Sequence, residues 1–179
     1  MIANILNAIT LSRLFCAVLI YLILFLESNY SLALFLFFVA SFSDFLDGYL
    51  ARKTDSVSVL GEILDPIADK LLIVFVLIGL SINLDSFLIG FISAIIISRE
   101  IWVAALRDIN ARNNQSDKTK VTFLAKTKTA IQMSAILMYL FGLTLNNMMV
   151  LFFADIVLII ALLVTIQTGF QYTISTFKK

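Results

Sequence analysis

Apolar runs long enough to cross a bilayer follow one another along the chain, and they restrict what it can fold into. Hydrophobic residues make up 61% of the 179 residues and charged residues only 14%, which is far from the balance of a soluble domain. A helix needs about 20 apolar residues to span the hydrocarbon core. The sequence therefore predicts an all-α integral membrane protein, with residues 1–179 in one transmembrane domain. The six predicted transmembrane helices lie at about residues 7–26, 31–53, 58–80, 87–109, 123–145 and 149–172.

Carboxylates at helical spacing stand out in this apolar chain, where the second predicted helix ends and the third begins. They are Asp44, Asp47, Asp65 and Asp69. At about 100° per residue, each pair falls on one face of its helix. The face of the first pair also carries Gly48, Ala51 and Arg52, and the face of the second pair carries Gly61. Two helices therefore offer carboxylates toward a common space at one membrane face, where ionisable groups are costly and usually functional.

Such a cluster of carboxylates needs a bound cation to stay ionised, because like charges held close together in a poorly solvated site repel one another. The candidate ligands are all oxygen and the chain contains no histidine, which favours Mg²⁺ or Mn²⁺ over zinc. Carboxylates shared between two helices suit a pair of metal ions that clamp a phosphate or pyrophosphate. Small residues beside them leave room for a ligand, and Arg52 adds a positive charge for phosphate oxygens. Glu62 is either a supporting partner of this site or a solvated glutamate.

The spacing D-x2-D-G-x2-A-R-x8-G-x3-D-x3-D resembles the signature of the CDP-alcohol phosphatidyltransferases at all eight defining positions. The resemblance implies that an alcohol attacks the β-phosphorus of a CDP-activated lipid and expels CMP. It implies metal binding by the four aspartates, with Asp69 also acting as the base that takes the proton of the alcohol. Gly48, Ala51, Arg52 and Gly61 resemble the positions that cradle the nucleotide. A homodimer is a further implication of the resemblance.

Two further stretches resemble the phosphatidylglycerophosphate synthases within that family. They run from Arg99 to Arg107 and from Ala125 to Met133, with Ala125 in place of the usual glycine. This resemblance implies CDP-diacylglycerol as donor and sn-glycerol 3-phosphate as acceptor. The acceptor phosphate would be bound by Arg99, Arg107, Lys126 and Lys128. The two lysines point about 200° apart on a helix, so which of them contacts the substrate stays open, and a belt of surface charge is the alternative role for these basic residues.

Basic residues also predict the orientation in the membrane. The links after the first, third and fifth predicted helices contain no Lys or Arg, whereas most basic residues lie at the opposite side. The positive-inside rule makes that side cytoplasmic. We therefore expect a bacterial cell-membrane protein with both termini and the aspartates facing the cytosol, in contact with membrane lipids. Arg13 is either an anchor at the membrane surface or a phosphate contact.

Other functions fit the sequence less well. A formal net charge of +1 gives no sign of a nucleic-acid partner. A cation transporter would carry polar groups through the full depth of the membrane, and a membrane prenyltransferase would have more helices and two widely separated motifs. Within the same reaction type, serine, inositol phosphate or phosphatidylglycerol remains an alternative acceptor.

Overall fold

The structure is a computed structural model that describes residues 2–54, 59–119 and 123–178, and within them the side chains of 8–43, 64, 67–115, 117–118 and 127–178. The described residues form helices and no strand. In chain order the helices are α1 (Ile2–Phe25), α2 (Tyr30–Thr54), α3 (Val59–Asn83), α4 (Phe87–Arg112), the short 3₁₀-helix η1 (Ser116–Thr119), α5 (Phe123–Leu145) and α6 (Met148–Phe177).

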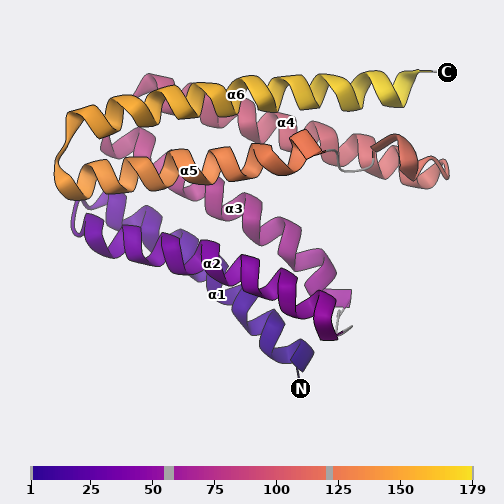
Figure 1. Ribbon diagram of the computed structural model, residues 1–179, viewed down its shortest axis with the longest axis horizontal. Coiled ribbons are helices and arrows are strands. Elements are labelled where there is room, and N and C mark those ends of the chain that lie inside the picture. Colours follow the sequence, from indigo (N-terminus) through magenta and orange to yellow (C-terminus); the bar gives the residue numbers. More distant parts are fainter. Residues whose placement is uncertain (1, 55–58, 120–122, 179) are drawn as a thin grey trace.

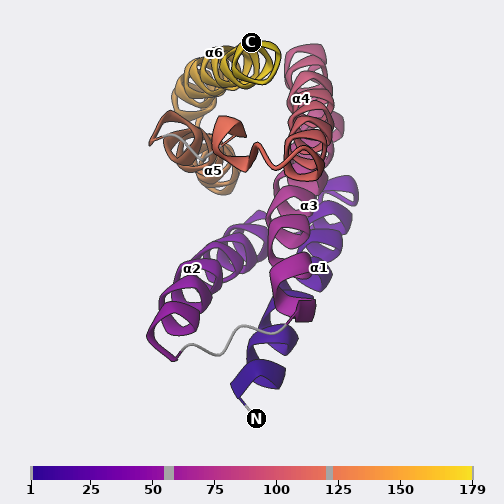
Figure 2. The same cartoon turned by 90° about the vertical axis from the view of Figure 1, so that its right-hand side faces the viewer.

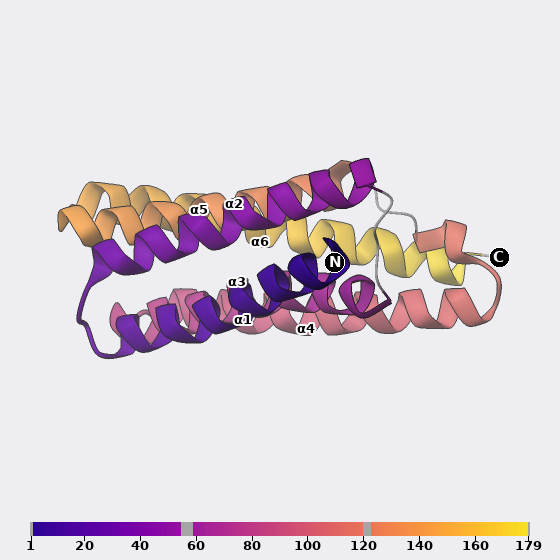
Figure 3. The ribbon, with the colours of Figure 1, turned by 90° about the horizontal axis from the view of Figure 1, so that it is seen from below.

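Successive long helices reverse direction, so the N- and C-terminal ends lie at the same end of the molecule (Figure 1). The turns that join α1 to α2, α3 to α4 and α5 to α6 lie at the opposite end. The helices form two groups, α1 to α3 and α4 to α6, which are seen end-on in Figure 2. Packing of α3 on α4 and of α2 on α5 joins the groups, and the second of these contacts is visible from below (Figure 3).

The turn between α5 and α6 shows how the chain reverses without a glycine at the turn position. Asn146 adopts φ 50°, a left-handed conformation that asparagine tolerates better than most residues. Its N–H donates to the Leu143 carbonyl at 3.2 Å, and the N–H of Asn147 donates to the Gly142 carbonyl at 2.9 Å. The Asn147 side chain then accepts a hydrogen bond from the N–H of Met149 at 3.0 Å. These contacts satisfy backbone groups that the helix ends would otherwise leave unpaired.

The apolar core includes the interface of α1 with α3. Ile20 of α1 and Val76 and Leu80 of α3 are fully buried. A Cβ added at Gly79 would lie 3.0 Å from Leu24 Cδ1, so the glycine lets the two helices approach closely. On the outside, large apolar side chains such as Phe170 are exposed, as expected for a surface that faces lipid.

Four helical segments among the described residues are long and apolar enough to cross a membrane, namely Ala8–Phe25, Phe87–Arg112, Thr127–Leu145 and Met148–Phe177. The predicted all-α membrane character is thus confirmed, and the predicted helices agree with the structure to within a few residues at most ends. The main differences are at α1, which begins at Ile2 rather than 7, and at α6, which ends at Phe177 rather than 172. Apolar length marks the stretch that crosses the bilayer, whereas a helix can continue beyond it.

Candidate functional site

The predicted metal ligands lie on two helices, at the end where α2 finishes and α3 begins. Asp44 and Asp47 are in the last three turns of α2, whereas Asp65 and Asp69 are in the first three turns of α3. Of these four side chains only Asp69 is among the described residues. The side chains of Asp44, Asp47 and Asp65 lie outside them, as do those of Ala51, Arg52, Glu62 and Lys126, and nothing further is described at Gly48 and Gly61. The four-aspartate metal site and the nucleotide cradle therefore stay predictions.

Asp69 is held from a neighbouring helix by a buried arginine. Nη1 of Arg13, on α1, lies 2.7 Å from Oδ1 of Asp69, and the Arg13 side chain is only 1% exposed. Its Nη2 also donates to Oγ1 of Thr10 at 3.4 Å. A charge removed from water in this way is costly unless an opposite charge compensates it. Arg13 therefore points inward to the predicted base, and it does not extend outward as an anchor at the membrane surface would.

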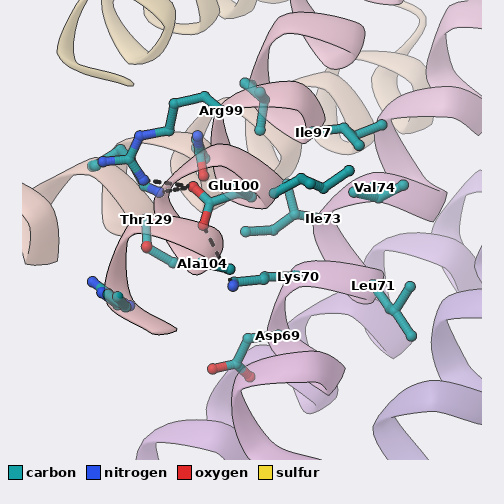
Figure 4. Close-up of a pocket in the computed structure, with 15 residues that line it drawn as sticks. Asp69, Lys70, Leu71, Ile73, Val74, Ile97, Arg99, Glu100, Ala104 and Thr129 are labelled. Carbon is teal, nitrogen blue, oxygen red and sulfur yellow. Dashed lines mark hydrogen bonds and ion pairs between the residues drawn. The ribbon is translucent and has the colours of Figure 1, made fainter. Parts of the chain in front are cut away.

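A cavity of about 540 Å³ opens beside Asp69, with walls from α3, α4 and α5 (Figure 4). Its apolar lining includes Ile73, Ile97 and Ala104. Among the described residues, its charged lining comprises Asp69, Lys70, Arg99, Glu100, Arg107 and Lys128. Four cations against two carboxylates leave a formal excess of two positive charges. Such an excess in a largely apolar cavity suits a ligand that carries a phosphate dianion.

Three of the four cations of this cavity converge on one carboxylate, that of Glu100. Nη1 of Arg99 donates to Oε1 of Glu100 at 2.9 Å, and Nζ of Lys128 donates to the same oxygen. Nζ of Lys70 lies 3.8 Å from the other oxygen, Oε2. Glu100 thus connects basic residues from three helices, because Lys70 belongs to α3 and Lys128 to α5. These ion pairs hold the long basic side chains in the cavity wall.

The last helix, α6, contacts the two arginines that line the cavity, Arg99 and Arg107. Nη2 of Arg99 donates to Oγ1 of Thr168 at 2.8 Å. A Cβ added at Gly169 would lie 3.0 Å from Cγ of Arg99, so a larger residue there would press on the arginine. The ring of Tyr172 lies 5.7 Å from Cζ of Arg99 and 5.5 Å from Cζ of Arg107, within the range of a cation–π interaction. Contacts with α6 therefore position both guanidinium groups of α4.

Three of the four predicted acceptor-binding residues line this one cavity, Arg99, Arg107 and Lys128. The structure adds Lys70 and Glu100, for which sequence reasoning proposed no role. A signal for Glu100 was present, because an ionisable residue inside an apolar run usually marks function. Lys70 gave a similar signal, since it lies near the middle of the third predicted helix and directly follows Asp69.

Comparisons with known proteins identify the family of this chain. Residues 3–167 match the family model described as CDP-alcohol phosphatidyltransferase. A protein of Rickettsia bellii named CDP-diacylglycerol–glycerol-3-phosphate 3-phosphatidyltransferase is 38% identical, over 94% of this chain and 93% of its own length. Proteins of the same name from Haemophilus influenzae and Escherichia coli are 38% and 32% identical, over 82% and 74% of this chain and 78% and 74% of their own lengths. Because the match to the family model covers most of this chain, the chain belongs to the CDP-alcohol phosphatidyltransferase family.

Proposed function

We propose that this phosphatidyltransferase moves a phosphatidyl group from CDP-diacylglycerol to sn-glycerol 3-phosphate, giving phosphatidylglycerol phosphate and CMP. The observation that carries the proposal is the cavity beside Asp69, whose described lining residues have an excess of two positive charges. A phosphorylated acceptor needs such a cationic pocket, because it must approach a pyrophosphate and several carboxylates. Serine carries no net charge and would leave that excess unused. The names of the relatives support the same pair of substrates.

The donor half of the site is proposed at Asp44, Asp47, Asp65 and Asp69, with Gly48, Ala51, Arg52 and Gly61 around the nucleotide. Asp69 fits a metal-binding role by its chemistry, since it presents a partly exposed hard oxygen ligand next to the cavity. Two Mg²⁺ or Mn²⁺ ions held there would neutralise the pyrophosphate and stabilise CMP as it leaves. Arg13 fixes the direction of the Asp69 carboxylate through its contact at 2.7 Å.

The acceptor half of the site is proposed at Arg99, Arg107 and Lys128, together with Lys70 and with Lys126, whose side chain is not described. Bound there, the phosphate of glycerol 3-phosphate lies against the basic wall on α4 and α5, while Asp69 lies on the α3 wall of the same cavity. A hydroxyl directed at Asp69 can lose its proton to that carboxylate as its oxygen attacks the β-phosphorus. The new P–O bond forms as the bond to CMP breaks, which completes the transfer.

The proposal includes a position in the cell. We place all six long helices across the cell membrane of a bacterium, as one domain over residues 1–179 that forms a homodimer, with both termini and the site at the cytoplasmic face. Supporting this orientation, both ends of the chain lie on the side opposite the turns in Figure 1, the side where α4 finishes at Arg112. Mg²⁺, CDP-diacylglycerol and glycerol 3-phosphate can all reach a site at that face.

An acceptor panel tests the proposed function. Purified protein in detergent would receive CDP-diacylglycerol, Mg²⁺ and one alcohol at a time, and mass spectrometry would identify the lipid formed. Glycerol 3-phosphate should yield phosphatidylglycerol phosphate, whereas glycerol, serine, inositol phosphate and phosphatidylglycerol should yield little product. Equal or better use of any of these four would overturn the assigned acceptor.

A further inference from the structure

Glu100 is a carboxylate inside a cavity that is proposed to bind an anion, and the proposed function gives it no task. Its side chain is only 18% exposed. Removing a carboxylate from water is costly, so its retention in a phosphate pocket needs a reason beyond phosphate binding. Bracing the basic side chains is one reason, but bracing engages mainly one of its two oxygens.

The two oxygens of Glu100 have different surroundings. Oε1 accepts hydrogen bonds from both Arg99 and Lys128. Oε2 lies 3.8 Å from Nζ of Lys70, a separation too long for a hydrogen bond. Figure 4 shows this oxygen directed toward Lys70, which lies between Glu100 and Asp69. Oε2 therefore keeps capacity to accept a hydrogen bond in the part of the cavity that faces Asp69.

A polyol phosphate brings more than a phosphate into such a cavity. Its hydroxyl groups need acceptors as well as donors, and arginine and lysine can only donate. The charged acceptors among the described lining residues are Asp69 and Glu100. If Asp69 receives the proton of the less hindered primary hydroxyl, Glu100 is the ionised acceptor left for the secondary hydroxyl. Thr129 and Gln132 also line the cavity, but a neutral oxygen is a weaker acceptor than a carboxylate.

We infer that Oε2 of Glu100 accepts a hydrogen bond from the non-reacting hydroxyl of the acceptor, which makes Glu100 a specificity-determining residue for polyol phosphates. The inference rests on the proposed function. Oε1 meanwhile keeps Arg99 and Lys128 in place for the phosphate. A site built to bind a hydroxyl discriminates against an analogue that lacks it, because the buried polar group then loses its partner. The relevant analogue is 3-hydroxypropyl phosphate, which keeps the phosphate and a primary hydroxyl but has no hydroxyl on the middle carbon.

The test measures kcat/KM of the purified enzyme for glycerol 3-phosphate and for 3-hydroxypropyl phosphate. The wild type should prefer glycerol 3-phosphate by about tenfold to a hundredfold, the range expected for a hydrogen bond to a charged group. In Glu100→Gln this preference should fall to about threefold or less, because the amide is neutral and a weaker partner. The ratio is the decisive readout, since general damage to the pocket would lower both values together.

Two further variants keep the test decisive. Asp108→Asn removes a carboxylate from the same helix, where Asp108 is exposed and pairs with Arg112, and it should keep the wild-type preference. Glu100→Asp retains the charge that the basic residues need but withdraws the oxygens by one carbon–carbon bond, so its preference should also fall. If the Glu100→Gln protein does not fold, the acceptor preference of Glu100→Asp provides the test instead.

The possible failures can be told apart. A wild-type preference in active Glu100→Gln or Glu100→Asp protein, or loss of the preference in Thr129→Val alone, would overturn the role of Glu100 and leave the proposed function intact. Equal use of both acceptors by the wild type would also overturn the role of Glu100. Failure of the wild type to form any lipid from glycerol 3-phosphate would overturn the proposed function and this inference with it.

Discussion

The buried contact between Arg13 and Asp69 links the first helix to the predicted base of the reaction. A planar guanidinium can fix the direction of a carboxylate, whereas a lysine ammonium is a point charge on a flexible stem. Arg13→Lys should therefore keep the charge but lower kcat by about tenfold or more, the loss typical when a catalytic group is misplaced. Steady-state kinetics would show this, with thermal unfolding of the detergent-solubilised protein as a check on folding.

The matched control for Arg13 is an arginine whose ion pair is exposed. Arg112 pairs with Asp108 at 2.8 Å on the surface of α4, with the Arg112 side chain 77% exposed. Exposed pairs contribute little to stability, so Arg112→Lys should leave both kcat and unfolding unchanged. Equal activity of Arg13→Lys and wild type would show that the contact does not position Asp69.

The basic residues of the cavity should act mainly on the acceptor. Arg99→Gln, Arg107→Gln and at least one of Lys126→Gln and Lys128→Gln should raise KM for glycerol 3-phosphate, or lower kcat/KM, by about tenfold to a hundredfold. The KM for CDP-diacylglycerol should change much less, because the donor is proposed to bind at the aspartates. Normal glycerol 3-phosphate kinetics in all four variants would contradict the assignment of this pocket.

The positions of residues in the cavity were predictable from sequence most directly where one helix carries the pattern. Arg99 and Arg107 are eight positions apart on α4, so helical periodicity brought them to the same cavity. The pairing of Arg13 with Asp69 joins residues 56 positions apart. That contact depends on how α1 packs on α3, and no local periodicity contains this information. Glu100 could be recognised as an ionisable residue in an apolar run, but its three basic partners come from three different helices.

At the level of elements, α6 supports α4 at the site without lining the cavity. Gly169→Ala should push on Arg99, because the new Cβ would lie 3.0 Å from its Cγ. We expect KM for glycerol 3-phosphate to rise severalfold, by less than about tenfold, since one contact is displaced and not lost. Measured stability should not fall, because alanine favours a helix over glycine.

The control for Gly169 is Gly142 of α5, which lies near the turn from α5 to α6. A Cβ at Gly142 would lie 2.7 Å from Cδ2 of Leu151, at the turn from α5 to α6. Gly142→Ala should therefore lower the unfolding temperature and leave KM for the acceptor unchanged. If the two variants behaved alike, α6 would have no specific role at the acceptor pocket.

Element positions followed closely from the sequence, because bilayer thickness sets the length of each apolar run. Helix ends were predicted less accurately where a helix continues beyond its apolar run. The fourth predicted helix ends at about residue 109, whereas α4 continues to Arg112 before η1 begins. Packing of α4 against α6 stabilises this extension, through Asn110 Nδ2, which donates to Thr176 Oγ1 at 2.8 Å.

For the whole molecule, the central expectation concerns orientation in the membrane. In a Cys16→Ala background, single cysteines at Ser28 or Met148 should react with an impermeant thiol reagent added outside intact cells, because both lie at the turns opposite the termini. A cysteine at Gln115, between α4 and η1, should react only after the cells are opened. These exposed positions avoid the left-handed residues Glu27, Asp85, Asn114 and Asn146. The reverse pattern would place the site outside the cell.

The most direct test of the whole account is the release of CMP by the purified protein. With CDP-diacylglycerol, Mg²⁺ and glycerol 3-phosphate, CMP and phosphatidylglycerol phosphate should form in equal amounts, and neither should form without the acceptor. Excess chelator, or substitution of Asp44, Asp47, Asp65 or Asp69 by Asn, should abolish most of the release while the protein still folds, because each change weakens the proposed metal site. Full CMP release in excess chelator, or by Asp65→Asn protein, would contradict the account.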